Sequence, residues 1–165
     1  MKRILIFACV VSFFALLGRT ALAAPAADVS TKFTRLAFKG TAQSPEVYGA
    51  SYPIVSLNAS GSGIATELGQ FTFVYKGEIN LTDLSTVEAA QFVGLNGNRI
   101  DVNGVGQATE TARPGIYNLV QIYKVTGGSG RFTGAKGTIT VNRIVNMASG
   151  LTYSTFDGYL LVPSQ

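Results

Sequence analysis

Apolar residues recur mostly at every second position of this chain, which is the spacing of strands with one face on a core. In the segment 71–76, Phe71, Phe73 and Tyr75 share one face, and Gly77 then predicts a bulge or bend. Helical periodicity is weak throughout. We therefore predict eight strands, at about 32–39, 63–67, 71–76, 88–95, 99–106, 116–126, 137–143 and 153–162.

The separators between these segments are turn-forming. Asn96-Gly97 is a strong hairpin signal, and 113–115 (Arg-Pro-Gly) and 148–150 (Ala-Ser-Gly) break the chain in the same way. The segment 43–46 (Gln-Ser-Pro-Glu) reads as a surface loop. Because closure of successive antiparallel strands removes exposed sheet edges, we expect an all-β fold with an eight-stranded up-and-down barrel rather than a sandwich.

The N-terminus has the pattern of a secretory leader. Lys2 and Arg3 precede an apolar run from 4 to 17, and 21–23 (Ala-Leu-Ala) fits a cleavage site. The run is shorter than the roughly 20 residues that span a bilayer as a helix. We predict a signal peptide at 1–23, a single barrel domain at 24–165 without a membrane span, and secretion to the periplasm or the extracellular space.

Composition excludes several kinds of chemistry. The leader holds three of the 13 basic residues, so the remaining chain has ten against nine acidic ones, and no cluster suited to nucleic acid remains. There is no His, and Cys9 lies in the leader. A catalytic triad, a Cys nucleophile and a thiolate or imidazole zinc site are therefore ruled out, and we expect no cofactor.

Two predicted strands are apolar on both faces. In 116–126, Val120 and Ile122 lie on one face, and Leu119 and Tyr123 lie on the other. The segment 153–162 shows the same pattern. One side of a barrel wall is normally polar, so a covering is expected on the outside. Either a subunit interface or a terminal segment of the chain would provide it.

A glycine-rich segment from 123 to 141 is the most specific motif. Its glycines lead into another strand pattern rather than a helix, which argues against a nucleotide-binding loop. We interpret it as a tight structural turn whose Phe132 fills the core. The turn residues are Gly127, Gly128, Gly130, Phe132, Gly134 and Gly137.

This segment resembles the Gly-Gly-Ser-Gly-x-Phe-x-Gly turn of allene oxide cyclases and the related turn of plant dirigent proteins. The likeness extends to 99–104, to Tyr123-x-Val125 and to 152–158, and covers roughly 95–162. The resemblance implies an eight-stranded antiparallel barrel that commonly forms trimers, so we expect a homo-oligomer. One fold can host several functions.

The resemblance does not extend to catalytic residues. Allene oxide cyclases use a small polar constellation that includes a carboxylate on the first strand and ordered water. Here the first predicted strand offers Phe33, Leu36 and Phe38, and the next acid is Glu46 in the predicted loop. We therefore carry over no catalytic residue and lean towards a protein that is not an enzyme.

Polar residues in an apolar barrel are the remaining candidates for contacting a ligand. A strand tyrosine more often packs its ring, and a glutamate near a turn is more often solvated. With that alternative open, the candidate ligand-binding residues are Tyr75, Gln91, Glu110, Tyr123 and Tyr159.

Three functions remain open. The first is non-catalytic binding of a small apolar ligand inside the barrel. The second is a structural or self-associating protein of the envelope or extracellular surface. The third is a cyclase, isomerase or dirigent-like protein that constrains a reactive intermediate. A cavity in the lumen would favour the first and third, and a packed lumen the second.

Overall fold

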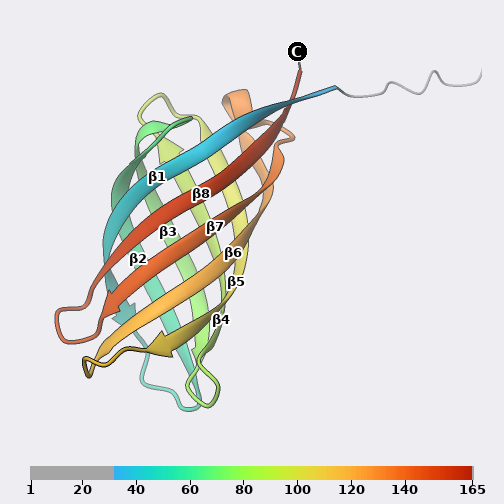
Figure 1. Ribbon diagram of the computed structural model, residues 1–165. Helices are drawn as coiled ribbons and strands as arrows, with labels where there is room; N and C mark the ends of the chain where they lie inside the picture. Colours follow the sequence, from blue (N-terminus) through green and yellow to red (C-terminus); the bar gives the residue numbers. More distant parts are fainter. Residues whose placement is uncertain (1–31, 165) are drawn as a thin grey trace, which may run out of the picture. The chain divides into compact units, whose positions relative to one another are not determined.

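The computed structural model describes residues 32–164, and these form a closed barrel of eight antiparallel strands (Figure 1). Each strand pairs with its neighbours in sequence, and β8 returns to pair with β1. The elements are β1 (Phe33–Tyr48), β2 (Ile54–Ala65), β3 (Gly69–Asn80), β4 (Ser85–Gly94), β5 (Arg99–Glu110), β6 (Ile116–Ser129), the 3-10 turn η1 (Gly130–Phe132), β7 (Lys136–Asn146) and β8 (Leu151–Pro163). The predicted all-β closed barrel is confirmed, whereas the predicted leader lies outside the described residues.

The segment 43–46 is not a surface loop, as its sequence suggested. It continues β1, which pairs with β8 as far as Pro45 and with β2 on both sides of Ser44 and Pro45. Ser44 and Glu46 face inward and are 1% and 9% exposed. Polar residues at inward positions broke the apolar alternation, and Pro45 reads as a turn signal although it lies within a strand.

Two further predictions about strands were wrong. The strand at 63–67 is shifted, because β2 covers 54–65 and ends before the turn. Its inward positions include Ala59, Gly61 and Gly63, whose small side chains give little hydrophobic signal. Gly77 makes no bulge, since β3 stays in register with both neighbours there. A Cβ at Gly77 would lie 2.6 Å from the Cβ of Glu88, so the glycine makes room instead.

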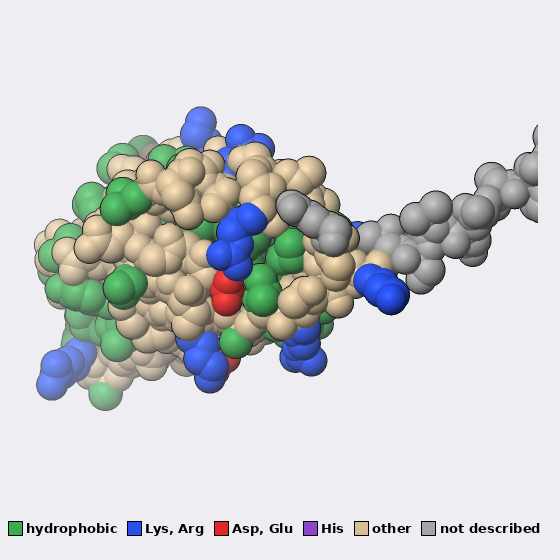
Figure 2. Space-filling view, turned by 90° about the horizontal axis from the view of Figure 1, so that it is seen from above, with side chains coloured by type: hydrophobic (Ala, Val, Ile, Leu, Met, Phe, Trp, Pro, Cys, Tyr) green, Lys and Arg blue, Asp and Glu red, His purple; other side chains and the backbone are tan. Residues whose placement is uncertain are grey.

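One end of the barrel is filled by aromatic side chains. This is the end of the β2–β3, β4–β5 and β6–β7 connections, which Figure 2 shows from above. The ring centroid of Phe92 lies 5.5 Å from those of Phe71 and Phe156, and the ring planes are nearly perpendicular. This is a preferred arrangement of aromatic pairs. Phe132 of η1 is fully buried in the same core. We call this the closed end.

Glycines on one strand accommodate bulky side chains on the next. Gly104 of β5 is paired with Tyr123 of β6, whose side chain is fully buried. A Cβ on Gly104 would clash with Cδ1 and Cε1 of the Tyr123 ring. The inward position of Tyr123 therefore depends on the absence of a side chain opposite it.

We expect Gly104→Ala to lower the free energy of unfolding by about 1–3 kcal/mol, because the added methyl group overpacks the interior. Urea denaturation followed by tyrosine fluorescence measures the loss. Gly127→Ala is the matched control, since a Cβ at that position meets nothing within 4 Å. Equal stabilities of the two variants would contradict this account of the interior.

Candidate functional site

Polar side chains form a layer across the barrel between the aromatic core and the opposite end. They come from five strands, because the alternation of each strand turns one or two residues inward at this level of the barrel. Its members are Glu46 and Tyr48 of β1, Tyr75 of β3, Thr86 and Glu88 of β4, Gln121 and Tyr123 of β6, and Arg143 of β7.

A buried ion pair lies at the centre of this layer. The Arg143 Nη1 atom is 3.2 Å from Glu88 Oε1, and the two side chains are 3% and 1% exposed. Arg143 also donates to the Tyr123 hydroxyl, and Gln121 Nε2 donates to Glu88 and to Thr86 Oγ1. These contacts offset part of the cost of burying both charges, while Arg143 Nε and Gln121 Oε1 have no hydrogen-bond partner among the described residues.

Glu46 accepts hydrogen bonds from two phenols. The Tyr48 and Tyr75 hydroxyls donate to its two carboxylate oxygens, one to each. The Arg143 guanidinium lies over the Tyr75 ring, 4.4 Å from its centroid, and so links Glu46 to the Glu88 pair through Tyr75. Two carboxylates and one guanidinium thus share one connected layer.

The environment keeps the phenols protonated. Burial raises the pKa of Tyr75 well above its ordinary value of 10.0; Arg143 opposes the rise and Glu46 adds to it. Burial likewise raises the pKa of Tyr123, with Arg143 opposing and Glu88 adding. For Tyr48, burial and then Glu46 raise the pKa. Burial alone would lower the pKa of Arg143, but Tyr123 and Glu88 raise it above the ordinary value. The phenols therefore act as hydrogen-bond donors.

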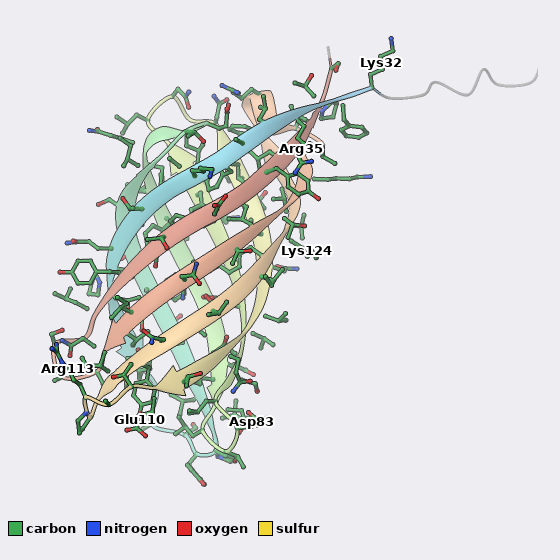
Figure 3. All side chains as sticks on the ribbon, in the orientation of Figure 1. Lys32, Arg35, Asp83, Glu110, Arg113 and Lys124 are labelled. Carbon is green, nitrogen blue, oxygen red and sulfur yellow. The ribbon has the colours of Figure 1, made fainter. Side chains whose placement is uncertain are left out.

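A pocket of about 250 Å³ opens next to this layer. It lies at the end of the β1–β2, β3–β4, β5–β6 and β7–β8 connections, opposite the closed end, where Figure 3 labels Asp83, Glu110 and Arg113. We call it the mouth pocket. Its walls are mainly aliphatic, and β1, β4 and β6 add a few polar residues. The lining includes Val55, Leu57, Ile79, Leu84, Ala108, Leu119 and Val145, with Glu46, Tyr48, Thr86 and Tyr117.

The structure places the predicted ligand-binding residues in different environments. Tyr75 and Tyr123 lie inside the barrel and belong to the polar layer. Gln91 is exposed on the outer face, between the inward Ala90 and Phe92.

The other two also lie away from the interior. Glu110 is exposed at the end of β5. Tyr159 is on the outer face, where the Arg35 guanidinium lies 4.0 Å from its ring centroid. Gln91, Glu110 and Tyr159 therefore do not join Tyr75 and Tyr123.

The glycine-rich turn lies at the closed end, away from the mouth pocket. Gly127 and Gly128 belong to β6, and Gly130 opens η1 with φ of 63°. Gly134 and Gly137 also have positive φ, at 72° and 152°. These are conformations that side chains disfavour, which explains glycine there.

Sequence reasoning missed Glu46, Glu88 and Arg143. For Arg143 a signal existed, because it continues the inward series of Ile139 and Val141 on β7. Glu46 reverses an earlier conclusion: the first strand does carry a carboxylate into the barrel. Within residues 32–164, no three Asp, Glu, His or Cys side chains are grouped as a metal site requires.

Comparisons with known proteins identify the fold. No protein-family model and no curated protein matches the sequence. Among solved structures, the pterocarpan synthase dirigent protein PsPTS1 has a TM-score of 0.51 at 14% identity, covering 81% of this chain and 97% of that one. The dirigent protein GePTS1, also a pterocarpan synthase, has a TM-score of 0.49 at 16% identity, covering 81% and 92%. The chain has the barrel fold of dirigent proteins.

The resemblance to dirigent proteins is thus confirmed at the level of fold. An identity of 14% carries the dirigent-like backbone arrangement but not the activity of the relative. In the part of the chain that the structure describes, no helix is long and apolar enough to cross a membrane. The function of this dirigent-like barrel has to be argued from its own interior.

The buried tyrosines predict how stability depends on pH. The pKa of Tyr75 and Tyr123 is raised on folding, so above pH 10.0 the unfolded chain loses their protons first. The stability that these two protonated phenols contribute to the folded state is fully present below pH 10.0. Above it, we expect the free energy of unfolding to fall by about 1.4 kcal/mol per pH unit for each of them.

Denaturation with urea between pH 8 and 11.5 measures this slope. Tyr75→Phe should reduce the slope above pH 10, because it removes one titrating group. Tyr153→Phe, at an exposed position on the outer face, is the control and should leave the slope unchanged. A Tyr75→Phe slope equal to that of the unmodified protein would contradict the prediction.

Proposed function

We propose that this barrel is an exported protein that binds a small, mostly apolar molecule in the mouth pocket. The observation that carries the proposal is the pocket itself, whose mainly aliphatic lining also includes Glu46 and Thr86. An apolar cavity with a few convergent polar groups is the usual form of a small-molecule site. The leader pattern at 1–23 supports export.

The two ends of the barrel have different roles in this proposal. The aromatic core at the closed end is packed and holds the strands in register, while the mouth pocket stays open for a ligand. The polar layer between them fixes the direction of Glu46, because both of its oxygens already accept a phenol hydroxyl. The bound molecule would thus meet a preorganised carboxylate.

We expect Ala108→Trp to abolish binding, because Ala108 lines the pocket and an indole there would occupy the ligand's volume. Native mass spectrometry of the protein purified without detergent reports any bound small molecule as an added mass. Ala37→Trp is the control: Ala37 is exposed on β1, and it should retain the added mass. The thermal unfolding temperature shows whether each variant is folded.

Absence of a bound molecule from the unmodified protein would argue against the proposal. So would an unchanged added mass on folded Ala108→Trp protein.

The same pocket supports a dirigent-like role as a second candidate. The PsPTS1 structure, which shares the fold, is of a pterocarpan synthase dirigent protein. Here the pocket lining includes Glu46, whose carboxylate accepts hydrogen bonds from two phenols, and general acid–base catalysis by such groups needs no nucleophile or metal. A cyclase or isomerase that constrains a reactive intermediate needs shape and such dipoles. Conversion of the bound molecule, lost in Glu46→Gln, would favour this role over simple binding.

A row of apolar side chains on the outer wall supports self-association as a further candidate. Val87, Val105 and Ile122 are paired side by side across β4, β5 and β6 and are 52%, 59% and 39% exposed. Exposed rows of this kind are typical of contact surfaces. A second copy of the chain is the occupant we propose, in agreement with the oligomer that the resemblance implies.

We expect Val105→Lys to convert the oligomer to monomer, because a lysine in the middle of the row would be buried without a partner. Sedimentation velocity measures the change. Thr72→Lys, on the exposed face of β3, is the control and should leave the oligomer intact. A monomeric unmodified protein, or an oligomeric Val105→Lys, would exclude this row as the interface.

A further inference from the structure

The interior of the barrel carries one more negative charge than positive charge. Among residues 32–164, the buried charged side chains are Glu46, Glu88 and Arg143. Arg143 forms its ion pair with Glu88, and none of the four ion pairs in the described part of the chain includes Glu46. Glu46 is therefore a buried carboxylate without a cation of its own.

Both carboxylate oxygens of Glu46 accept a hydrogen bond. Both neighbouring phenols donate to it, and their raised pKa values keep those donors protonated. An ionised carboxylate offers about four lone-pair directions, of which these bonds use two. Because Glu46 also lines the mouth pocket, free acceptor capacity lies at the pocket wall.

The lining of the pocket supplies no cation. The lining residues include neither Lys nor Arg, and the loops at this end contribute only Asp83 and Arg113 as charged residues. At the closed end, Lys32, Arg131 and Lys136 lie near the chain ends and the β6–β7 connection, and Figure 2 shows Lys and Arg side chains over that end. Arg143 of the adjacent polar layer is paired with Glu88, so within the described residues no Lys or Arg lines the pocket beside Glu46.

We propose that the mouth pocket selects molecules with a protonated amine at one end of an apolar body. This rests on the proposed function and adds the chemical class of the ligand. The ammonium would donate to Glu46, next to the rings of Tyr48 and Tyr117, which also line the pocket. The apolar body would lie against Leu57, Leu119 and Val145. A carboxylate ligand would instead meet Glu46 as a like charge.

Isothermal titration calorimetry with three probes of equal chain length tests this selection. The probes are n-hexylamine, n-hexanol and n-hexanoate at pH 7. A charge-assisted hydrogen bond is stronger than a neutral one, so we expect the amine to bind about tenfold more tightly than the alcohol. Hexanoate should show no binding. Higher salt should weaken binding of the amine and leave that of the alcohol unchanged.

A matched pair of variants assigns the effect to Glu46. Glu46→Gln keeps the size of the side chain and removes its charge, so hexylamine affinity should fall about tenfold while hexanol affinity changes little. Glu78→Gln removes an exposed carboxylate from the outer face of β3 and should change neither affinity. Thermal unfolding shows whether the variants are folded.

The ranking of the three probes on the unmodified protein tests the proposal independently of any variant. If hexanol binds and hexylamine binds no more tightly, selection of amines is overturned while binding of apolar molecules stands. Preferred binding of hexanoate would overturn it in the same way. If none of the three probes binds, both this inference and the proposed function fail.

Discussion

The ladder between β1 and β8 closes the sheet, and the rest of the structure depends on that closure. It runs from Phe33, opposite Pro163, to Pro45, opposite Leu151. An open sheet would have two faces and two unpaired edges, whereas a closed one has an inside and an outside. Every strand must then send alternate residues into the same narrow space. Ser44 and Glu46 are buried for this reason, although both side chains are polar.

The filling of that space changes along the barrel axis. At the closed end, phenylalanines pack edge to face and need no hydrogen-bond partner. Towards the mouth, Glu88 and Arg143 are buried as a pair, and loss of either partner would leave an uncompensated charge in the interior. Replacing such a pair by an apolar core of equal volume is often neutral or stabilising. The presence of the pair beside a pocket is therefore better explained by function than by stability.

The sequence predicted the fold better than the site, and particular residues show why. Period-two patterns such as Phe71, Phe73 and Tyr75 predict strands, and turn signals such as Asn96-Gly97 separate them, so the eight-stranded barrel followed. The pattern does not state which face is inside when both are partly apolar. On β4, one face carries Ala90 and Phe92 and the other carries Ala89 and Val93, so both faces are partly apolar. Glu88 lies on the first face, which is inside, and Gln91 lies on the second. A one-residue shift exchanges the two faces completely.

Backbone pairing and interior packing constrain this sequence in different ways. The backbone ladder tolerates many sequences, so a dirigent protein at 14% identity can share the fold over 81% of this chain. Interior side chains are less free, since each must match its neighbours in size: Gly104 has to be small because Tyr123 is large. Charge is a separate constraint. The packing of the aromatic core and of Gly104 against Tyr123 does not depend on Glu46. The buried carboxylate of Glu46 therefore requires a different explanation, and a ligand in the mouth pocket supplies one.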